Sequence, residues 1–175
     1  MTIFEAVLLF VLLQRGGELI LARANTARLL RGGATEIDRA GYPWFIVLHA
    51  AWLVALAVTV PAATPPDWPL LAAFLLLQIG RLWVIASLGR RWTTRLIVAR
   101  DAPLVAAGPY RWFRHPNYLI VAGEIAILPL AFNAVAIAVV FFAANAALVV
   151  RRIRLENAAL GLASYHIRET LTRRS

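Results

Sequence analysis

The sequence predicts an all-α integral membrane protein with about five transmembrane helices. Three observations predict this class: 61% of the 175 residues are hydrophobic, only 15% are charged, and the apolar residues gather in long runs. A soluble domain averages about half apolar and about a quarter charged residues. Because the hydrocarbon offers no partners for unpaired backbone groups, and because the alternating pattern of a membrane barrel is absent, we expect helical spans. They form one domain over residues 1–175.

Five apolar segments define the expected helices, and they cover residues 3–21, 43–60, 69–88, 118–130 and 134–150. A helix needs about 20 residues to cross roughly 30 Å of hydrocarbon, and the fourth segment is shorter than that. The stretch 129–133 predicts a tight turn, so the fourth and fifth helices form a helical hairpin. We expect the tail, residues 151–175, either to continue the fifth helix into the cytoplasm or to lie along the interface.

The basic residues predict the orientation in the membrane. The formal net charge is +9, and every basic residue is an arginine. These charges flank apolar spans and line no soluble face, so we expect no nucleic-acid partner. In a five-span layout, every arginine outside the spans falls on one side of the membrane, which the positive-inside rule makes cytoplasmic. We expect the N-terminus outside and the C-terminus in the cytoplasm.

The composition also bears on location and on metal chemistry. No basic region precedes the first apolar run, so that run reads as a retained span and not as a signal peptide. The lack of lysine and the high alanine content suggest a GC-rich bacterial genome, hence a bacterial inner membrane. The absence of cysteine excludes disulfides, thiolate metal sites and cysteine nucleophiles, and we expect no metal site.

Polar residues inside the first span share one helix face. Arg15 precedes Glu18 by three residues and Gln14 precedes it by four, spacings that place side chains together on a helix. Two interpretations stay open: a structural ion pair near the cytoplasmic end of the helix, or the wall of a site that faces the bundle interior.

The other polar residues inside spans are also expected to find partners. Arg81, in the third span, is expected to pair with Glu18 or Glu124. An isolated carboxylate in lipid is costly, so Glu124 must pair, protonate or meet water, and both a structural and a functional role are open. His49 is expected to be an ordinary interior or interfacial histidine. Asn145 is expected to make a hydrogen bond between helices.

The densest chemistry lies in residues 104–118, which read Leu-Val-Ala-Ala-Gly-Pro-Tyr-Arg-Trp-Phe-Arg-His-Pro-Asn-Tyr. Pro116 suits the first turn of a helix, so Arg114 and His115 stand just before the fourth span. A helix N-terminus with free N–H groups and partial positive charge is a natural anion site. A belt of interfacial aromatic residues and arginines is an equally open interpretation.

Here the sequence resembles a known family. The pattern Gly-Pro-Tyr-x-x-x-Arg-His-Pro-x-Tyr of residues 108–118 looks like that of the isoprenylcysteine carboxyl methyltransferase family, and more loosely that of the phospholipid methyltransferases. The pattern Arg-Ile-x-x-Glu-Asn-x-x-Leu of residues 152–160 is similar to the family's Arg-Ile-x-x-Glu-Glu-x-x-Leu. The resemblance covers residues 91–160. Ile120 and Asn157 depart from it, at positions where the family often has glycine and the second glutamate.

The resemblance implies S-adenosylmethionine as methyl donor, bound in a cytoplasmic pocket without a Rossmann domain. The cofactor-binding residues that it implies are Leu104, Val105, Tyr110, His115, Pro116, Asn117, Tyr118 and Glu156. It assigns Arg152 to the substrate. We predict Arg152 and His115 as catalytic residues, and Arg152 and Glu124 as residues that contact the substrate.

The predicted function is O-methylation of a lipophilic, prenyl- or alkyl-bearing substrate at the membrane interface. A carboxylate, with a pKa of about 4, needs no base, and Arg152 suits it as a bidentate partner. A phenol needs a base, for which His115 and Glu124 are candidates. Suitable acceptors include isoprenylcysteine, an alkyl pyrone or a prenyl acid; membrane lipids are the other partners. The alternatives are a phospholipid-type N-methyltransferase, an NADPH-dependent sterol-type reductase, and a non-catalytic scaffold or small transporter.

Overall fold

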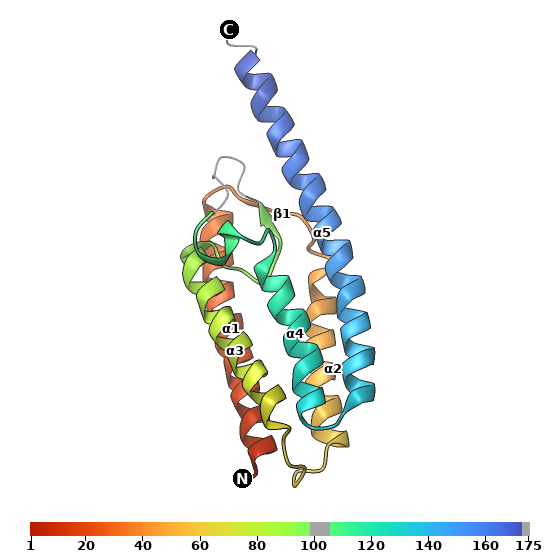
Figure 1. Ribbon diagram of the computed structural model, residues 1–175. Coiled ribbons are helices and arrows are strands. Elements are labelled where there is room, and N and C mark those ends of the chain that lie inside the picture. The colour runs from red at the N-terminus through yellow and green to blue at the C-terminus, as the bar shows by residue number, and fades with distance from the viewer. Residues whose placement is uncertain (99–105, 173–175) are drawn as a thin grey trace.

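The computed structural model describes residues 1–98 and 106–172, with side chains through residue 159. Five helices run lengthwise beside one another (Figure 1), and their bounds are α1 Ile3–Arg31, α2 Tyr42–Thr59, α3 Trp68–Leu88, α4 Pro116–Ala131 and α5 Val135–Thr172. Two 3₁₀ turns, η1 (Gly89–Arg91) and η2 (Gly108–Arg111), and two short strands, β1 (Thr35–Glu36) and β2 (Ile97–Val98), complete the described elements. The prediction of an all-α protein with five helices is confirmed.

Three of the described helices are long and apolar enough to cross a bilayer: α2, α3 with its continuation through Arg91, and the part of α5 before residue 160. The apolar part of α1 carries three charged residues, Glu5, Arg15 and Glu18. With 16 residues, α4 is about 24 Å long, since a helix rises about 1.5 Å per residue. The chain is an integral membrane protein in which α1 carries charges that need partners.

Two helices differ from the expected lengths. α1 continues well past residue 21 to Arg31, because residues 22–31 contain no glycine or proline. α5 continues through residue 172, which answers the question about the tail in favour of a continued helix. In Figure 1 its last turns leave the bundle.

The α4–α5 hairpin turns at Asn133, which adopts φ 60°, a left-handed conformation that asparagine tolerates better than most residues. The backbone N–H of Ala134 donates to the Pro129 carbonyl at 2.9 Å. The predicted tight turn is therefore confirmed. At the same end, the Asp67 carboxylate accepts a hydrogen bond at 3.0 Å from the N–H of Leu70 in the first turn of α3.

The two ends of the bundle differ in composition. The N-terminus, the α2–α3 loop and the α4–α5 turn lie at one end (Figure 1), and neither connection carries an arginine. The α1–α2 connection and the described residues between α3 and α4 lie at the other end, where α5 projects. Six arginines lie in the sequence between α3 and α4, Arg39 lies in the α1–α2 connection, and Arg28 and Arg31 lie in the last turn of α1. We call this end the arginine-rich end.

Glycines bring α3 and α4 close together. A Cβ atom on Gly123 would lie 2.9 Å from Leu77, and one on Gly80 would lie 3.3 Å from Ile120. Small residues let membrane helices approach closely. This contact aligns the first turns of α4 with the end of α3, where the segments that form the candidate site begin.

Candidate functional site

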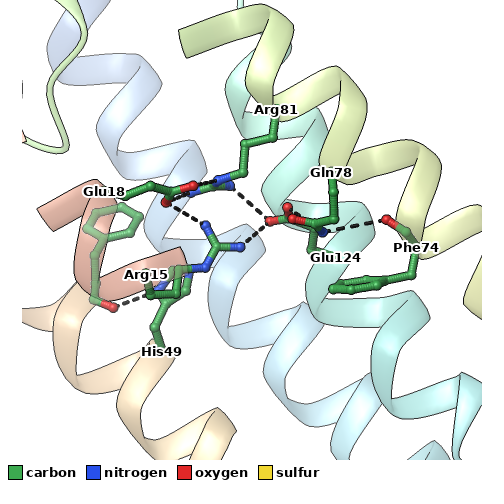
Figure 2. Close-up of polar contacts among 8 residues, drawn as sticks. Arg15, Glu18, His49, Phe74, Gln78, Arg81 and Glu124 are labelled. Atoms are coloured by element: carbon green, nitrogen blue, oxygen red, sulfur yellow. Dashed lines mark hydrogen bonds and ion pairs between the residues drawn. The ribbon is translucent and has the colours of Figure 1, made fainter. Parts of the chain in front are cut away.

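A network of ion pairs lies inside the bundle and joins three helices (Figure 2). We call it the ion network; its members are Arg15 and Glu18 of α1, Gln78 and Arg81 of α3, and Glu124 of α4. Glu124, only 1% exposed, accepts hydrogen bonds from Arg15 at 2.6 Å, Arg81 at 2.9 Å and Gln78 at 3.0 Å. Glu18 accepts from Arg15 at 2.9 Å and from Nη2 of Arg81 at 2.6 Å, and it also contacts Nε of Arg81.

These contacts answer the expectations for the charged residues inside spans. Arg81 pairs with both candidate partners, Glu18 and Glu124, and Arg15 bridges the same two carboxylates. Two guanidinium groups face two carboxylates, so the charges balance. Pairing of this kind is what makes buried charges tolerable in an apolar medium.

Two other polar residues of the spans have different outcomes. The His49 ring Nδ1 lies 2.7 Å from the Phe45 carbonyl within α2, as suits an ordinary interior histidine. Asn145 is fully buried, yet its side-chain N and O atoms have no hydrogen-bond partner among the described residues. The predicted hydrogen bond between helices is therefore wrong: burial placed the side chain inside the protein, but no described donor or acceptor reaches its amide.

A cavity of about 530 Å³ opens at the arginine-rich end, a size typical of ligand sites. It lies between α1, α3, the start of α4, α5 and the described segments on either side of residues 99–105. The polar and aromatic residues among those that line it are Arg81, Arg91, Trp92, Thr93, Thr94, Arg95, Tyr110, Arg114, His115, Asn117, Tyr118, Arg152 and Glu156. Arg81 therefore belongs to both the ion network and the cavity wall.

The start of α4 and the middle of α5 meet in this cavity. Pro116 begins α4, consistent with the preference of proline for the first helical position, and this places Tyr118 in the first turn. The Tyr118 hydroxyl donates to the Glu156 carboxylate at 3.0 Å, and Nδ1 of His115 lies 3.8 Å from the same oxygen. The His115 and Tyr118 rings stack with centroids 5.4 Å apart.

Some polar atoms at this cluster lack partners. His115 Nε2 and Asn117 Oδ1 are buried and have no hydrogen-bond partner among the described residues. Buried polar atoms of folded proteins are nearly always hydrogen-bonded, so an orphan at a cavity wall points to a missing ligand or water.

Arg152 stands one helical turn before Glu156 on the same face of α5. It is 8% exposed, and its Nη1 donates to the Thr94 carbonyl at 2.9 Å. The guanidinium carbon lies 5.1 Å from the Phe45 ring centroid and 5.8 Å from that of Tyr118, distances typical of cation–π contacts. Its Nε is buried without a partner in the described part of the chain.

The remaining predicted residues take other positions. Tyr110 lines the cavity from η2, where burial, with a smaller effect from the nearby Glu156 charge, raises the pKa of Tyr110 to about 12. Pro116 is buried and is not among the lining residues. Leu104 and Val105 lie outside the described residues.

Glu124 lies in the ion network and does not line the cavity. Sequence reasoning missed Thr94 and Arg95, which do line it. They are brought there by the pairing of β1 with β2 and by an ion pair in which Nη1 of Arg95 lies 3.0 Å from Glu36. A short Thr-Thr-Arg stretch carries no local sign of such a role.

Comparison with known proteins identifies the family of this chain. Residues 70–162 match the profile described as the isoprenylcysteine carboxyl methyltransferase (ICMT) family. The chain belongs to this family. It is also similar to the uncharacterized protein YpbQ of Bacillus subtilis (strain 168), with 35% identity over 161 residues that cover 90% of this chain and 96% of YpbQ. No solved structure matches.

Membership in the isoprenylcysteine carboxyl methyltransferase family indicates a membrane methyltransferase, and it confirms the resemblance seen in the two motifs. The matched region holds nearly all of α3, all of α4 and most of α5. It therefore includes Arg152 and Glu156. α1 and α2 lie before it, although they supply Arg15 and Glu18 to the ion network and the Phe45 ring that lies against Arg152.

Proposed function

We propose that this protein is an S-adenosylmethionine-dependent O-methyltransferase that acts on the carboxyl or acidic hydroxyl group of a lipophilic, prenyl- or alkyl-bearing substrate. The observation that carries the proposal is the juxtaposition in one cavity of the Glu156–Tyr118–His115 cluster and Arg152. The first group suits a methyl donor, and the second suits an acid.

The residues present fit the donor. Glu156 supplies a carboxylate for a ligand that bears a sulfonium and an ammonium group. His115 Nε2 and Asn117 Oδ1 are buried polar atoms without described partners, and a polar ligand in the cavity would satisfy them. When bound, S-adenosylmethionine supplies a methyl group on positively charged sulfur.

The charge of the cavity wall favours an acidic acceptor over an amine. The lining residues include five arginines, Arg81, Arg91, Arg95, Arg114 and Arg152, and one carboxylate, Glu156. Arg81 and Arg95 pair with glutamates outside the cavity wall, so the positive charge that matters here is that of Arg114 and Arg152. A cationic amine headgroup would meet an unfavourable field here, whereas an anionic acceptor would be attracted. This argues against the N-methyltransferase alternative.

The chemistry requires little of the protein beyond alignment. In the transfer, an oxygen–methyl bond forms while the sulfur–methyl bond breaks, and the bonding electron pair stays on sulfur. Arg152 holds the acceptor oxygens by its unpartnered Nε edge, which fixes the angle of attack; good alignment at about 3–3.5 Å supplies a large part of such rate enhancements. For a carboxylate no base is needed. For an acidic hydroxyl, Nε2 of His115 accepts the proton.

The position of the cavity suits two ligands of different solubility. A site at the arginine-rich end receives a water-soluble donor from the aqueous side and a lipophilic acceptor from the bilayer. Under the positive-inside rule this end is cytoplasmic. We propose that all five helices cross a bacterial inner membrane, with the N-terminus outside and the C-terminus in the cytoplasm. Reporter fusions at the C-terminus test this orientation, and a periplasmic signal would contradict it.

Isothermal calorimetry of the detergent-purified protein with S-adenosylhomocysteine tests the proposed function most directly. We expect saturable binding at micromolar ligand. Absence of binding at high micromolar concentration would overturn the methyltransferase proposal. Titration with NADPH is the parallel arm, because binding of NADPH without S-adenosylhomocysteine would favour the reductase alternative. Binding of neither ligand would favour a scaffold.

A further inference from the structure

Arg151 and Arg152 are neighbours on α5, and both are held by the N-terminal part of the chain. Nη1 and Nη2 of Arg151 donate to the two carboxylate oxygens of Asp38 at 2.8 and 3.0 Å. Asp38 lies in the α1–α2 connection and also accepts a hydrogen bond from the N–H of Gly41 at 3.1 Å. The Arg151–Asp38 pair therefore ties the start of α2 to the turn of α5 that carries Arg152.

The space around the Arg151–Asp38 ion pair is fully occupied. A Cβ atom on Gly41 would lie 2.1 Å from an Asp38 oxygen and 2.3 Å from Nη1 of Arg151. No side chain fits there without moving the ion pair. Glycine at this position lets the backbone come close enough for Asp38 to reach across to α5.

Arg152 is held by a second set of contacts from α2. The Tyr42 hydroxyl lies 2.9 Å from Oγ1 of Thr94, and the carbonyl of the same Thr94 accepts the hydrogen bond from Arg152. The Phe45 ring, one turn after Tyr42, lies 5.1 Å from the guanidinium carbon. Two residues of α2 thus bear on Arg152, one by contact and one through Thr94.

The Tyr42–Thr94 bond is itself braced. The Arg95 guanidinium carbon lies 4.7 Å from the Tyr42 ring centroid, and Arg95 pairs with Glu36 of β1 at 3.0 and 3.1 Å. With one edge occupied by Thr94, Arg152 keeps a buried Nε without a described partner. The contacts of Tyr42, Thr94 and Phe45 set the direction in which the Arg152 Nε points.

From these contacts we infer that Tyr42 and Phe45 are positioning residues of the methyl-transfer site: they fix Arg152 so that its remaining edge meets the acceptor. The inference rests on the proposed function. It makes α2, which precedes the region matched by the family, part of the acceptor site. The expected consequence is large for such small contacts, because a displacement of about 1 Å at a reacting group can reduce a rate a hundredfold.

The test uses Tyr42→Phe, Thr94→Val and the double variant of the full-length protein in detergent micelles. Thr59→Val is the matched control, because Thr59 is exposed at the far end of α2 and bonds only to its own helix among the described residues. Methyl transfer from S-adenosylmethionine to a farnesylated cysteine acid is measured together with the affinity for S-adenosylhomocysteine. We expect each single variant to raise the acceptor KM about tenfold, with cofactor affinity and the unfolding midpoint little changed.

The double variant is expected to lose no more than either single variant, since both remove the same hydrogen bond. Phe45→Leu should raise the acceptor KM as well, whereas Thr59→Val should not. A second readout needs no turnover: the side-chain Nε–H NMR signal of Arg152, assigned by its loss in Arg152→Lys, should show greater mobility in Tyr42→Phe.

The outcomes separate the two proposals. A wild-type protein that does not bind S-adenosylhomocysteine overturns the proposed function, and the acceptor role of Tyr42 with it. A wild-type protein that binds the ligand and methylates the acid, with variants whose KM stays within twofold, overturns only the positioning inference. If the ligand binds but this acid is not methylated, an Arg152 signal of equal mobility in wild type and Tyr42→Phe overturns the inference.

Discussion

The ion network and the cavity wall both contain arginines and glutamates, but they differ in how completely their polar groups are paired. In the ion network, two guanidinium groups meet two carboxylates inside the bundle, and each charged group contacts at least one opposite charge. In the cavity wall, Arg152 Nε and His115 Nε2 are buried without a described partner, and Glu156 is the one carboxylate among the described lining residues.

This difference separates charged groups that stabilise the fold from charged groups that are available to bind a ligand. A balanced and hydrogen-bonded cluster in an apolar medium has little left to offer a substrate, whereas buried polar atoms without partners are costly unless something binds them. Arg81 lines the cavity, yet each of its three guanidinium nitrogens donates to Glu18 or Glu124. We therefore expect acid recognition at Arg152 and not at Arg81.

Removing one charge from the ion network should give the largest effect on stability. Glu124→Gln leaves two arginines against one carboxylate, and we expect a loss of about 3–5 kcal/mol in the free energy of unfolding, measured by denaturant titration in micelles. Gln78→Leu, which removes one hydrogen bond and no charge, should cost about 1 kcal/mol. Equal losses in the two variants would show that charge balance is not what holds the helices together.

The balance itself has a direct test. Arg15→Met combined with Glu124→Gln removes one charge of each sign, so part of the stability lost in Glu124→Gln should return. If the double variant is less stable than Glu124→Gln by the full cost of Arg15→Met alone, the two residues are energetically independent.

Substitution of Arg152 should have the opposite effect: a large loss of activity and a smaller loss of stability than in Glu124→Gln. Arg152→Ala should lower kcat/KM for an acidic acceptor about a hundredfold or more, because the acid loses a charged, hydrogen-bonding partner in a site shielded from water. The unfolding midpoint should move less than in Glu124→Gln, and S-adenosylhomocysteine should still bind. Arg154→Ala, an exposed arginine two residues further along α5, is the control and should retain activity. An inactive Arg154→Ala would mean that net charge, and not the position of Arg152, governs turnover.

The cofactor half of the cavity should respond more moderately. Glu156→Gln keeps the shape of the side chain but removes the negative charge that accepts the hydrogen bond from the Tyr118 hydroxyl. We expect about tenfold weaker binding of S-adenosylhomocysteine in calorimetry, in line with the loss of a charge-assisted hydrogen bond. Asn157→Ala, at an exposed neighbour, should bind normally. Unchanged affinity in Glu156→Gln would remove Glu156 from the donor site.

The smallest effect is expected at Tyr110. Since burial raises the pKa of Tyr110 to about 12, above the ordinary value near 10, its hydroxyl stays neutral at every pH below that range. It therefore does not titrate between about pH 6 and about pH 9. Tyr110→Phe should weaken cofactor binding by about threefold or less and leave the shape of the pH–rate profile unchanged. A pH–rate profile of Tyr110→Phe that lacks the acidic or the basic flank seen in the wild type would contradict the assignment of Tyr110 as a non-titrating residue.

Much of the architecture is readable from local patterns. Long apolar runs predict the helices, the Pro129–Asn133 stretch predicts the hairpin, and the three-residue spacing of Arg15 and Glu18 predicts their shared face. The expectation that Arg81 pairs with a glutamate of another span is confirmed, because an arginine in a bilayer has few alternatives. These features depend on sequence spacing or on the cost of an unpaired charge.

Features that depend on how distant segments meet were not predictable. The Thr94 carbonyl that receives Arg152 is a backbone atom, which every residue has, and nothing in the sequence marks this one. Nothing in the sequence marks Tyr42 and Phe45 either, because their role depends on the pairing of β1 with β2, which sets Thr94 beside Tyr42. Asn145 shows the converse limit: its polarity predicted a hydrogen bond, and its burial came without one.

The ion network also has a consequence for the order in which the chain enters the bilayer. α1 contains Arg15 and Glu18 as an internal pair at 2.9 Å, so Arg15 enters the bilayer with a counter-charge on its own helix. α3 brings Arg81 without a counter-charge of its own, and it meets one only in Glu18 and Glu124. We therefore expect α1, which is synthesised first, to supply a counter-charge for Arg81 of α3. Residues 68–175 expressed alone keep Glu124 but lack Glu18, so they should insert less completely than the whole chain, and co-expression of residues 1–62 should improve their insertion.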